Sequence, residues 1–402
     1  MEKIHRSLLR IFWIFASFLM LISLSANAGE IKTFLGKAAI LTRRTNSEAS
    51  IGAAGGRYPI SKVEQEGSRR TDALDKGVVS ALVGNHEDDG AVLGANNLDR
   101  LGGGSVVTAS IASTSNVMPI PFQLAEGLIY IQASLNGSAP LWVMLDTGSS
   151  VTVFDESVSR VLGIRFVGEG KAYGPGQGSS QKLPYARHTT LSFAGVELGD
   201  QTVGSLPLEW FSCEIGRSTD GFLGSDVFRN YVVEIDYSNQ VLRLYDPSDY
   251  SYSGPGQRLP LQFVWNGIPT VHAEVVGSDG TVADGTFLVD SGATTAVWLT
   301  KSFNDAHPEL FSTQETVPAP SVVAVGGAVN ARFGHVFAIR LGGLVVSMPM
   351  TQFLENTSGT FAAPGLAGTI GAQMLSRFKV IFDYKHGEMI LESHDRFGEP
   401  SA

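Results

Sequence analysis

Leu141-Trp142-Val143-Met144-Leu145-Asp146-Thr147-Gly148-Ser149-Ser150 is the stretch from which the fold of this chain can be read. An apolar run, typical of a buried strand, ends in one carboxylate and a turn of small residues. The pattern returns 144 positions later as Thr286-Phe287-Leu288-Val289-Asp290-Ser291-Gly292-Ala293-Thr294. One such turn arises by chance, but two copies, each after an apolar run, predict that Asp146 and Asp290 meet in one cleft and act together.

Further landmarks recur in the same order around the two aspartate turns. They are Pro121–Leu124 with Pro260–Phe263, Gly221–Gly224 with Gly368–Gly371, and Tyr231–Tyr237 with Phe378–Tyr384. Because order and spacing are kept, the chain is interpreted as a tandem duplication of one lobe of about 140 residues, the size of an ordinary domain. We expect lobes at residues 116–250 and 258–395, joined by a Pro-, Gly- and Ser-rich linker at 251–257.

Short apolar stretches separated by Gly, Ser, Asn and Asp turns fill both halves, which predicts an all-β fold. The duplication adds that this fold is bilobal, with pseudo-twofold symmetry and a cleft between the lobes. Helical signals are few. We expect short helices only at residues 155–162, 224–231, 300–311 and 371–378.

Charge and cysteine content exclude several classes of protein. The 402-residue chain has a net charge of −10, and its basic residues are scattered, so nucleic acid is not an expected partner. Cys213 is the only cysteine, which excludes an intramolecular disulfide and a cysteine-based metal cluster. Without a partner at ligand spacing, its side chain is expected to be buried or half-buried.

The N-terminal residues 1–28 have the three parts of a secretory signal peptide. These parts are the basic residues Lys3, Arg6 and Arg10, the apolar run Ile11–Leu24, and the small residues Ala26-Asn27-Ala28. The run of about 14 residues is shorter than the ~20 that span a bilayer, which favours a cleaved signal over an uncleaved membrane anchor. The protein is therefore expected to be exported, either periplasmic or secreted.

Residues 29–115 differ from the rest of the chain in composition. Gly, Ala, Ser and Asn dominate, aromatic residues nearly vanish, and no strand or helix period is sustained. This predicts a weakly ordered, low-complexity leader. It is either an inhibitory prosegment or a spacer.

The paired motifs resemble those of the pepsin/retropepsin superfamily of aspartic proteases, in style closest to the bacterial retropepsin-like proteins. In that family each lobe supplies Asp-[Thr/Ser]-Gly-[Ser/Thr/Ala] and later an apolar-apolar-Gly segment that packs beneath the aspartate loop. The matching segments here are Asp146–Ser149 with Phe222–Gly224, and Asp290–Ala293 with Thr369–Gly371, where Thr369 departs from the apolar pattern. The resemblance covers residues 117–395 and implies two tandem β-barrel lobes, as in pepsin.

Two neighbouring carboxylates suit hydrolysis of a peptide bond without a covalent intermediate. One acts as a base toward water and the other as an acid toward the substrate, because repulsion and burial raise one pKa while hydrogen bonds depress the other. Asp146 and Asp290 are the predicted catalytic pair, and the shared proton belongs to the pair rather than to either residue.

Four neighbouring residues are expected to support this pair. Gly148 and Gly292 would allow the sharp turns and let backbone amides approach the carboxylates. The resemblance implies that the hydroxyls of Thr147 and Ser291 hydrogen-bond across the lobe interface and hold the two loops in register.

The two copies differ at the fourth position of the motif. Ser149 can donate a hydroxyl hydrogen bond to Asp146, whereas Ala293 cannot do the same for Asp290; Thr294, one residue further, is the alternative donor in the second copy. A missing donor would raise the pKa at which the pair begins to ionise. The hypothesis is a pH optimum less acidic than that of gastric-type relatives.

The resemblance also implies a β-hairpin flap over the cleft. Candidate flaps lie at residues 171–179 in the first lobe and 324–329 in the second. Their key residues are Tyr173, Gly174 and Gly176 in the first, and Gly326 and Gly327 in the second. Gly-rich tips are typical of a mobile lid that excludes water on closing, and two plain hairpin turns are the alternative.

The preferred interpretation is an aspartic endopeptidase that binds an extended polypeptide in the interlobe cleft, as a monomer. No metal or organic cofactor is expected, and no His pair has HExxH spacing. One alternative is a catalytically inactive peptide-binding or inhibitory protein on the same fold. Another is that each lobe pairs with a lobe of a partner chain. Both aspartates and their hydroxyl neighbours favour the enzyme, and the short linker favours pairing within one chain.

Overall fold

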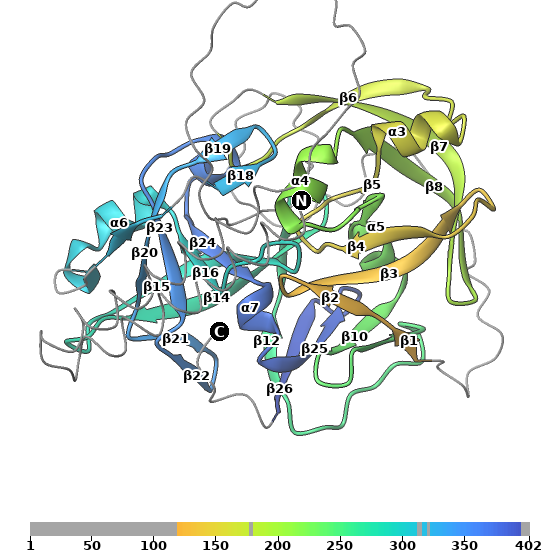
Figure 1. Ribbon diagram of the computed structural model, residues 1–402. Coiled ribbons are helices and arrows are strands. Elements are labelled where there is room, and N and C mark those ends of the chain that lie inside the picture. Colours follow the sequence, from red (N-terminus) through yellow and green to blue (C-terminus); the bar gives the residue numbers. More distant parts are fainter. Residues whose placement is uncertain (1–118, 177–179, 312–315, 320–321, 395–402) are drawn as a thin grey trace, which may run out of the picture. The chain divides into compact units, whose positions relative to one another are not determined.

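The computed structural model describes residues 119–176, 180–311, 316–319 and 322–394 (Figure 1). The predicted signal peptide and leader lie outside these residues. Within the described part, no helix has the length and apolar character needed to cross a membrane.

The first lobe is built on an eight-stranded sheet with the order β2-β3-β4-β9-β5-β8-β7-β6. Its strands are β2 (Gln123–Ala125), β3 (Leu128–Leu135), β4 (Leu141–Leu145), β5 (Thr152–Asp155), β6 (Gly168–Ala172), β7 (Gln181–Phe193), β8 (Val196–Leu206) and β9 (Gly221–Leu223). Strand β4, which leads to Asp146, lies parallel to β9, with Leu145 opposite Leu223. Three short helices accompany this sheet: α3 (Glu156–Val161), α4 (Glu209–Ile215) and α5 (Ser225–Asn230).

The second lobe repeats this arrangement. Its main sheet has the order β17-β20-β23-β16-β24-β15-β14-β21-β22, with β13 paired to β14. The strands are β13 (Gln262–Val264), β14 (Ile268–Val276), β15 (Val282–Asp290), β16 (Val297–Leu299), β17 (Val317–Pro318), β20 (Ala331–His335), β21 (Ala338–Leu341), β22 (Leu344–Ser347), β23 (Met350–Leu354) and β24 (Leu366–Gly371). A separate hairpin consists of β18 (Val322–Ala324) and β19 (Gly327–Val329), and the helical segments are α6 (Lys301–Ala306), η1 (Pro308–Phe311), η2 (Gly359–Ala362) and α7 (Ala372–Leu375).

The order β3-β4-β9-β5-β8-β7 in the first lobe matches β14-β15-β24-β16-β23-β20 in the second. The directions match as well, because β15 lies parallel to β24 just as β4 lies parallel to β9. The repeat that was read from the sequence is therefore a repeat of topology.

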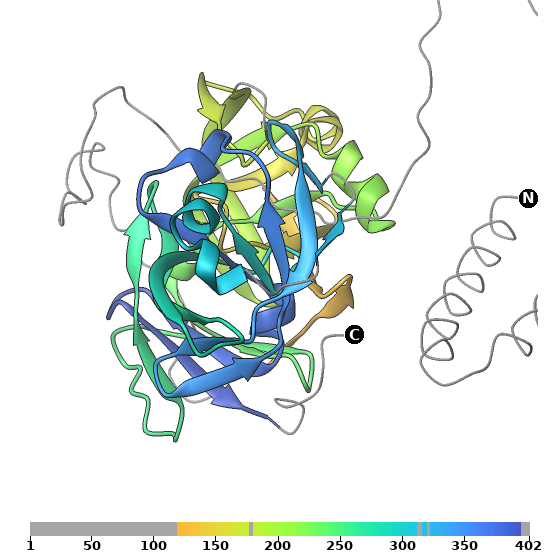
Figure 2. The same cartoon turned by 90° about the vertical axis from the view of Figure 1, so that its left-hand side faces the viewer.

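A third sheet of six strands joins the two halves, in the order β1-β11-β10-β25-β26-β12. Its strands are β1 (Ile120–Pro121), β10 (Val232–Asp236), β11 (Val241–Tyr245), β12 (Gln257–Pro260), β25 (Phe378–Asp383) and β26 (Glu388–Ser393). Each half contributes three strands, and β10 pairs antiparallel with β25 at the centre, with Ile235 opposite Val380. Figures 1 and 2 show this sheet in two views related by a 90° turn. The palindromic order places the pseudo-twofold axis between β10 and β25.

Where only one face of a strand is covered, every second residue is buried. Where both faces are covered, nearly every residue is buried. Along β11 every second residue is buried, whereas β4, β9 and β24 are buried at nearly every position near the aspartate loops. Apolar runs of this kind are typical of strands covered on both faces. The all-β bilobal fold predicted from the sequence is confirmed by this architecture.

Two of the short helices, α3 and α6, begin at a side-chain cap. The carboxylate of Asp155 accepts from the Ser157 amide at 2.8 Å and begins α3, and Thr300 Oγ1 accepts from the Phe303 amide at 3.3 Å and begins α6. Both caps satisfy amides that a helix start leaves without intrahelical partners. The four predicted helical segments correspond to α3, α5, α6 with η1, and α7.

Helix α4 was not predicted, and it changes the expectation for Cys213. Phe211 and Ile215 are buried one helical turn apart, so Cys213 lies between them on the opposite, exposed face. The prediction of a buried or half-buried thiol is therefore wrong.

Candidate active site

Both predicted catalytic aspartates lie at the carboxyl ends of equivalent strands. Asp146 follows β4 and Asp290 ends β15, and the two residues are 0% and 1% exposed. Each carboxylate accepts a hydrogen bond from the amide two residues further on. The Gly148 amide donates to Asp146 Oδ1 at 2.8 Å, and the Gly292 amide donates to Asp290 Oδ1 at 2.9 Å. The glycines thus have the position relative to the carboxylates that the sequence predicted.

Gly148 brings the two carboxylates together. Its amide donates to Asp146, and a Cβ atom on this residue would lie 2.5 Å from Cγ of Asp290. A contact that short cannot be accommodated without displacing Asp290, so only glycine fits between the two carboxylates. The structure therefore places side chains 144 positions apart against the same residue.

Thr147 and Ser291 connect the two aspartate loops through four reciprocal hydrogen bonds. The Thr147 amide donates to Ser291 Oγ at 3.0 Å, and the Ser291 amide donates to Thr147 Oγ1 at 2.9 Å. The two hydroxyls donate onward, from Thr147 to the Val289 carbonyl at 2.8 Å and from Ser291 to the Leu145 carbonyl at 3.0 Å. Because all four bonds are buried and cross between lobes, they fix the distance between the loops.

The apolar-apolar-Gly segments hold each aspartate loop from the other side. In the first lobe the Ser225 amide donates to the Ser149 carbonyl at 2.8 Å. In the second lobe the Ala372 amide donates to the Ala293 carbonyl at 2.7 Å. The two loops are therefore supported by the same main-chain contact.

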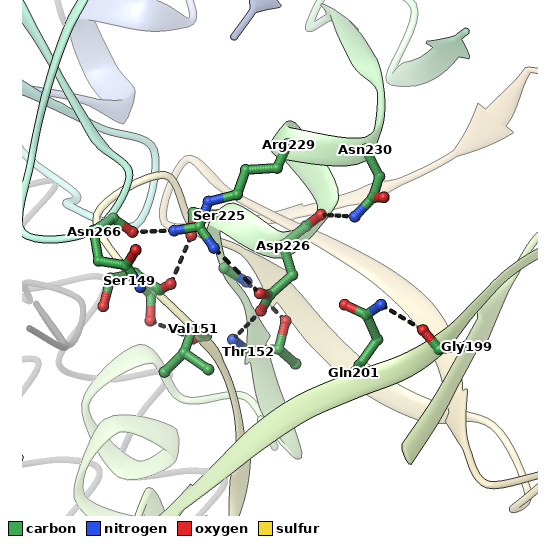
Figure 3. Close-up of polar contacts among 12 residues, drawn as sticks. Ser149, Val151, Thr152, Gly199, Gln201, Ser225, Asp226, Arg229, Asn230 and Asn266 are labelled. Carbon is green, nitrogen blue, oxygen red and sulfur yellow. Dashed lines mark hydrogen bonds and ion pairs between the residues drawn. The ribbon is translucent and has the colours of Figure 1, made fainter. Parts of the chain in front are cut away.

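Side-chain support differs between the lobes, and Figure 3 shows the first-lobe network. Asp226 on α5 accepts from the Thr152 amide at 2.6 Å, and Arg229 of the same helix lies 3.7 Å from that carboxylate. Arg229 also donates to the carbonyl of Asn266, in the turn between β13 and β14 of the second lobe. Burial raises the pKa of Asp226, and Arg229 opposes that effect.

Asp226 and Arg229 were missed in the sequence, although one signal was present. Asp226 lies two residues after Gly224, whereas Gln373 occupies the corresponding position two residues after Gly371. A carboxylate in only one copy of a repeat indicates a role that the other copy does not share.

Ser149 does not make the expected contact. Its hydroxyl donates to the Val151 carbonyl at 2.8 Å, as the close-up also shows (Figure 3). A hydroxyl has one hydrogen to donate, so Ser149 does not donate to Asp146. The prediction of this bond is wrong, and the hypothesis of a less acidic pH optimum loses its structural basis.

The two candidate flaps are β-hairpins. Strands β6 and β7 form the first, with Ala172 opposite Gln181, and residues 177–179 of its tip lie outside the described residues. Strands β18 and β19 form the second, with Ala324 opposite Gly327 across the turn. Gly326 and Gly327 have φ values of +89° and +109°, which disfavour any residue with a side chain. Tyr173 is half-buried beside the first tip.

The tips of the two hairpins contact each other. The Gly176 amide donates to the Val325 carbonyl at 3.1 Å. A Cβ on Gly174 would lie 2.1 Å from the Val325 carbonyl oxygen, and one on Gly176 would lie 2.2 Å from Gly326. The segment before η2 joins this contact, since Ser358 Oγ donates to the Pro175 carbonyl at 3.1 Å. The hairpins therefore meet backbone to backbone.

Val325 at the tip of the second hairpin packs into the apolar core of the first lobe. This wall cluster consists of Leu128, Tyr130, Met144, Val153, Ala172, Leu183, Leu206, Leu208, Phe211, Ile215 and Phe222, joined by Val325 and Ala372 from the second lobe. Val325 is 1% exposed. The second hairpin therefore covers part of this cluster, and both aspartates are buried as well.

The described part of the chain contains no cluster of side chains that could bind a metal ion. No group of three or more His, Cys, Asp or Glu side chains is arranged there to hold a metal ion. Two carboxylates with hydrogen-bonded amides remain the chemically distinctive group at the lobe interface.

A family model and a solved structure are similar to this chain. The model of the aspartyl protease family matches residues 131–227, which include the first aspartate loop and helix α4. No curated protein matches the chain. Among solved structures, the crystal structure of aspartic proteinase from Irpex lacteus is similar at 12% identity and a TM-score of 0.48, covering 71% of this chain and 99% of that one. The family match confirms the predicted resemblance of this chain to the pepsin/retropepsin-like aspartic proteases.

Proposed function

We propose that this protein is an aspartic endopeptidase whose catalytic pair is Asp146 and Asp290. The family match and the fold support a protease-type function. The observation that carries the finer proposal is the position of Gly148, which contacts both carboxylates at once. One water molecule could then form hydrogen bonds to both carboxylates.

The proposed reaction uses the two carboxyl groups as base and acid. The ionised carboxylate takes a proton from the water, and the hydroxide equivalent attacks the carbonyl carbon of the scissile bond. The protonated carboxyl group donates its proton to the carbonyl oxygen. When the tetrahedral intermediate breaks down, the protonated carboxyl group gives its proton to the departing amine nitrogen, a hydroxyl of the intermediate gives its proton to the other carboxylate, and the pair again holds one proton.

The reciprocal bonds of Thr147 and Ser291 support this chemistry by fixing the two loops. Catalytic groups must keep their productive geometry to within about 0.5 Å, and four buried hydrogen bonds between the loops provide that rigidity. The arrangement also supports pairing of the lobes within one chain rather than with a partner.

Substrate entry requires that the two hairpins separate. An extended polypeptide in the interlobe cleft would displace Val325 from the wall cluster and break the Gly176–Val325 bond. One main-chain hydrogen bond joins the two tips, so the hairpins suit the role of lids that open for substrate and exclude water on closing.

A catalytically inactive peptide-binding protein on the same fold is the second candidate. The burial of both aspartates favours it, because neither carboxylate is open to solvent in this conformation. The intact pair and the intact reciprocal bonds favour the enzyme, because a binder would have no need of two carboxylates on either side of one glycine.

Substitution of each aspartate tests the proposal. Purified wild-type protein, Asp146→Asn and Asp290→Asn are incubated with an unfolded protein substrate, and new amino termini are counted. We expect cleavage by the wild type and a loss of at least ~10³-fold in either variant. The matched control is Asp305→Asn, an exposed aspartate on α6. Activity that survives in either active-site variant refutes the two-aspartate mechanism, and a folded wild type without activity supports the binder.

Export remains a prediction, since residues 1–28 lie outside the described residues. We propose a periplasmic or secreted location. Amino-terminal sequencing of the protein recovered from cell fractions tests it, and a chain that begins at Met1 in the cytoplasmic fraction contradicts it.

A further inference from the structure

Arg217 is held between two aromatic rings in the first lobe. Its guanidinium carbon lies 4.4 Å from the ring centre of Tyr130 and 4.5 Å from that of Trp142. One guanidinium nitrogen donates to Gln123 Oε1 at 2.9 Å. Stacking on two rings fixes the plane of a guanidinium and leaves donors at its edge.

The rings beneath Arg217 lie on the strand face that leads to Asp146. Side chains alternate between the faces of a strand, so Trp142, Met144 and the following Asp146 point to the same side. Tyr130 is opposite Met144 in β3, and both belong to the wall cluster on which Val325 closes. Arg217 therefore borders the surface that opening of the second hairpin exposes.

The positive charge of Arg217 is not neutralised by an ion pair within the described part of the protein. No carboxylate there forms an ion pair with this side chain, although the other arginines near aromatic rings include Arg258, which pairs with Glu388 at 2.6 Å. Arg217 is half-buried rather than fully solvated. A fixed, half-buried cation beside the wall cluster is suited to an anionic ligand.

The second lobe has no such cation. The residues that correspond to Tyr130 and Trp142 in the repeat are Thr270 and Thr286, which offer no aromatic ring. The stacking of an arginine on two aromatic rings is therefore not required for the lobe to fold, because the second lobe folds without it.

We propose that Arg217 is a specificity-determining residue that binds an acidic side chain of the polypeptide substrate. This proposal rests on the proposed function. Asp146 lies four positions after Trp142, a distance of about 13 Å at ~3.3 Å per residue. An extended substrate rises by the same amount, so the acidic residue lies three to five positions from the scissile bond.

A peptide library tests the proposal. Wild type, Arg217→Met and Arg217→Glu are given the same mixture of peptides, and the cleavage sites are read by mass spectrometry. We expect Glu and Asp to be enriched at one position three to five residues from the cleaved bond in the wild type. Arg217→Met removes this enrichment, and Arg217→Glu replaces it with Lys and Arg. Arg187→Met is the matched control, because Arg187 also stacks on a ring, that of Tyr185, but is exposed.

The magnitude is measured on paired peptides that differ only by Glu or Gln at that position. A charge-assisted hydrogen bond to a half-buried group predicts about a tenfold higher kcat/KM for the Glu peptide, which Arg217→Met abolishes. Equal values in the wild type, or a preference that survives Arg217→Met, overturn the proposal.

Failure of the proposed function is distinguishable from failure of this inference. A folded wild type that cleaves neither the unfolded protein nor any library peptide refutes the enzyme. Binding of Glu- and Gln-containing library peptides, measured by fluorescence anisotropy, then decides the role of Arg217. About tenfold tighter binding of Glu peptides that Arg217→Met removes supports the role, and equal binding overturns it.

Discussion

Replacing Thr147 by Val removes the centre of the reciprocal bonds between the lobes without changing the shape of the side chain. The hydroxyl of Thr147 accepts from the Ser291 amide at 2.9 Å and donates to the Val289 carbonyl at 2.8 Å. Thr147 is 0% exposed, so water does not replace either bond. The variant leaves a buried amide and a buried carbonyl each without this partner.

The expected loss follows from those two groups. Each buried polar group that loses its partner lowers the free energy of unfolding by about 1–3 kcal/mol, and burial of the methyl group that replaces the hydroxyl raises it by about 0.8 kcal/mol. We expect Thr147→Val to lower the free energy of unfolding by about 3 kcal/mol. Because the bonds hold two loops that carry the catalytic carboxylates, kcat falls at least tenfold in the molecules that remain folded.

Thr189→Val is the matched control. Thr189 is also buried, at 3% exposure, but its hydroxyl donates to the Gln201 carbonyl at 2.9 Å within the first lobe. This change removes one bond and is expected to cost about 1 kcal/mol without altering kcat. Urea denaturation followed by tryptophan fluorescence gives the free energies, and cleavage of an unfolded protein gives the rates. If Thr147→Val costs no more than Thr189→Val, or keeps the wild-type kcat, the reasoning about the interlobe bonds is refuted.

Three further predictions address single contacts. Ser149→Ala leaves the pH–rate profile within about 0.3 pH unit of wild type, because its hydroxyl bonds to Val151; an acid limb that moves further contradicts the assigned hydrogen bond. Burial raises the pKa of Asp226 above the ordinary 3.8, so the contribution of this residue to stability is largest in acid and falls as the pH rises through the raised pKa. In urea titrations across pH 3–8, the stability of Asp226→Asn relative to wild type should therefore increase with pH, and a decrease refutes this direction. Gly176→Ala forces the hairpin tips apart, so limited proteolysis should cut the tip several-fold faster than in wild type, and unchanged cutting contradicts a closed tip contact.

Much of the fold could be predicted because its signals are local. The apolar runs before Asp146 and Asp290 have strand length, the turns after them carry glycine, and the same order of landmarks appears twice. A repeat of local patterns in one chain is sufficient to predict two copies of one topology, since each pattern fixes a strand, a turn or a helix start by its own chemistry. The helix α4 was missed because its seven residues carry no side-chain cap and, unlike the uncapped α5 and α7, it does not follow a landmark that recurs in both halves.

The sequence by itself determined the two lobes and the paired aspartate loops, because duplication forces equivalent residues to face each other across a pseudo-twofold axis. The reciprocal bonds of Thr147 and Ser291 were expected only from the family resemblance, and the structure shows them. Only the tertiary structure decided that Ser149 bonds to Val151, that the two hairpin tips meet and that Arg217 stacks on Tyr130 and Trp142. These contacts break the symmetry of the repeat. They depend on side-chain rotamers and on segments far apart in the chain, for which neither the residue period nor the motif spacing carries information.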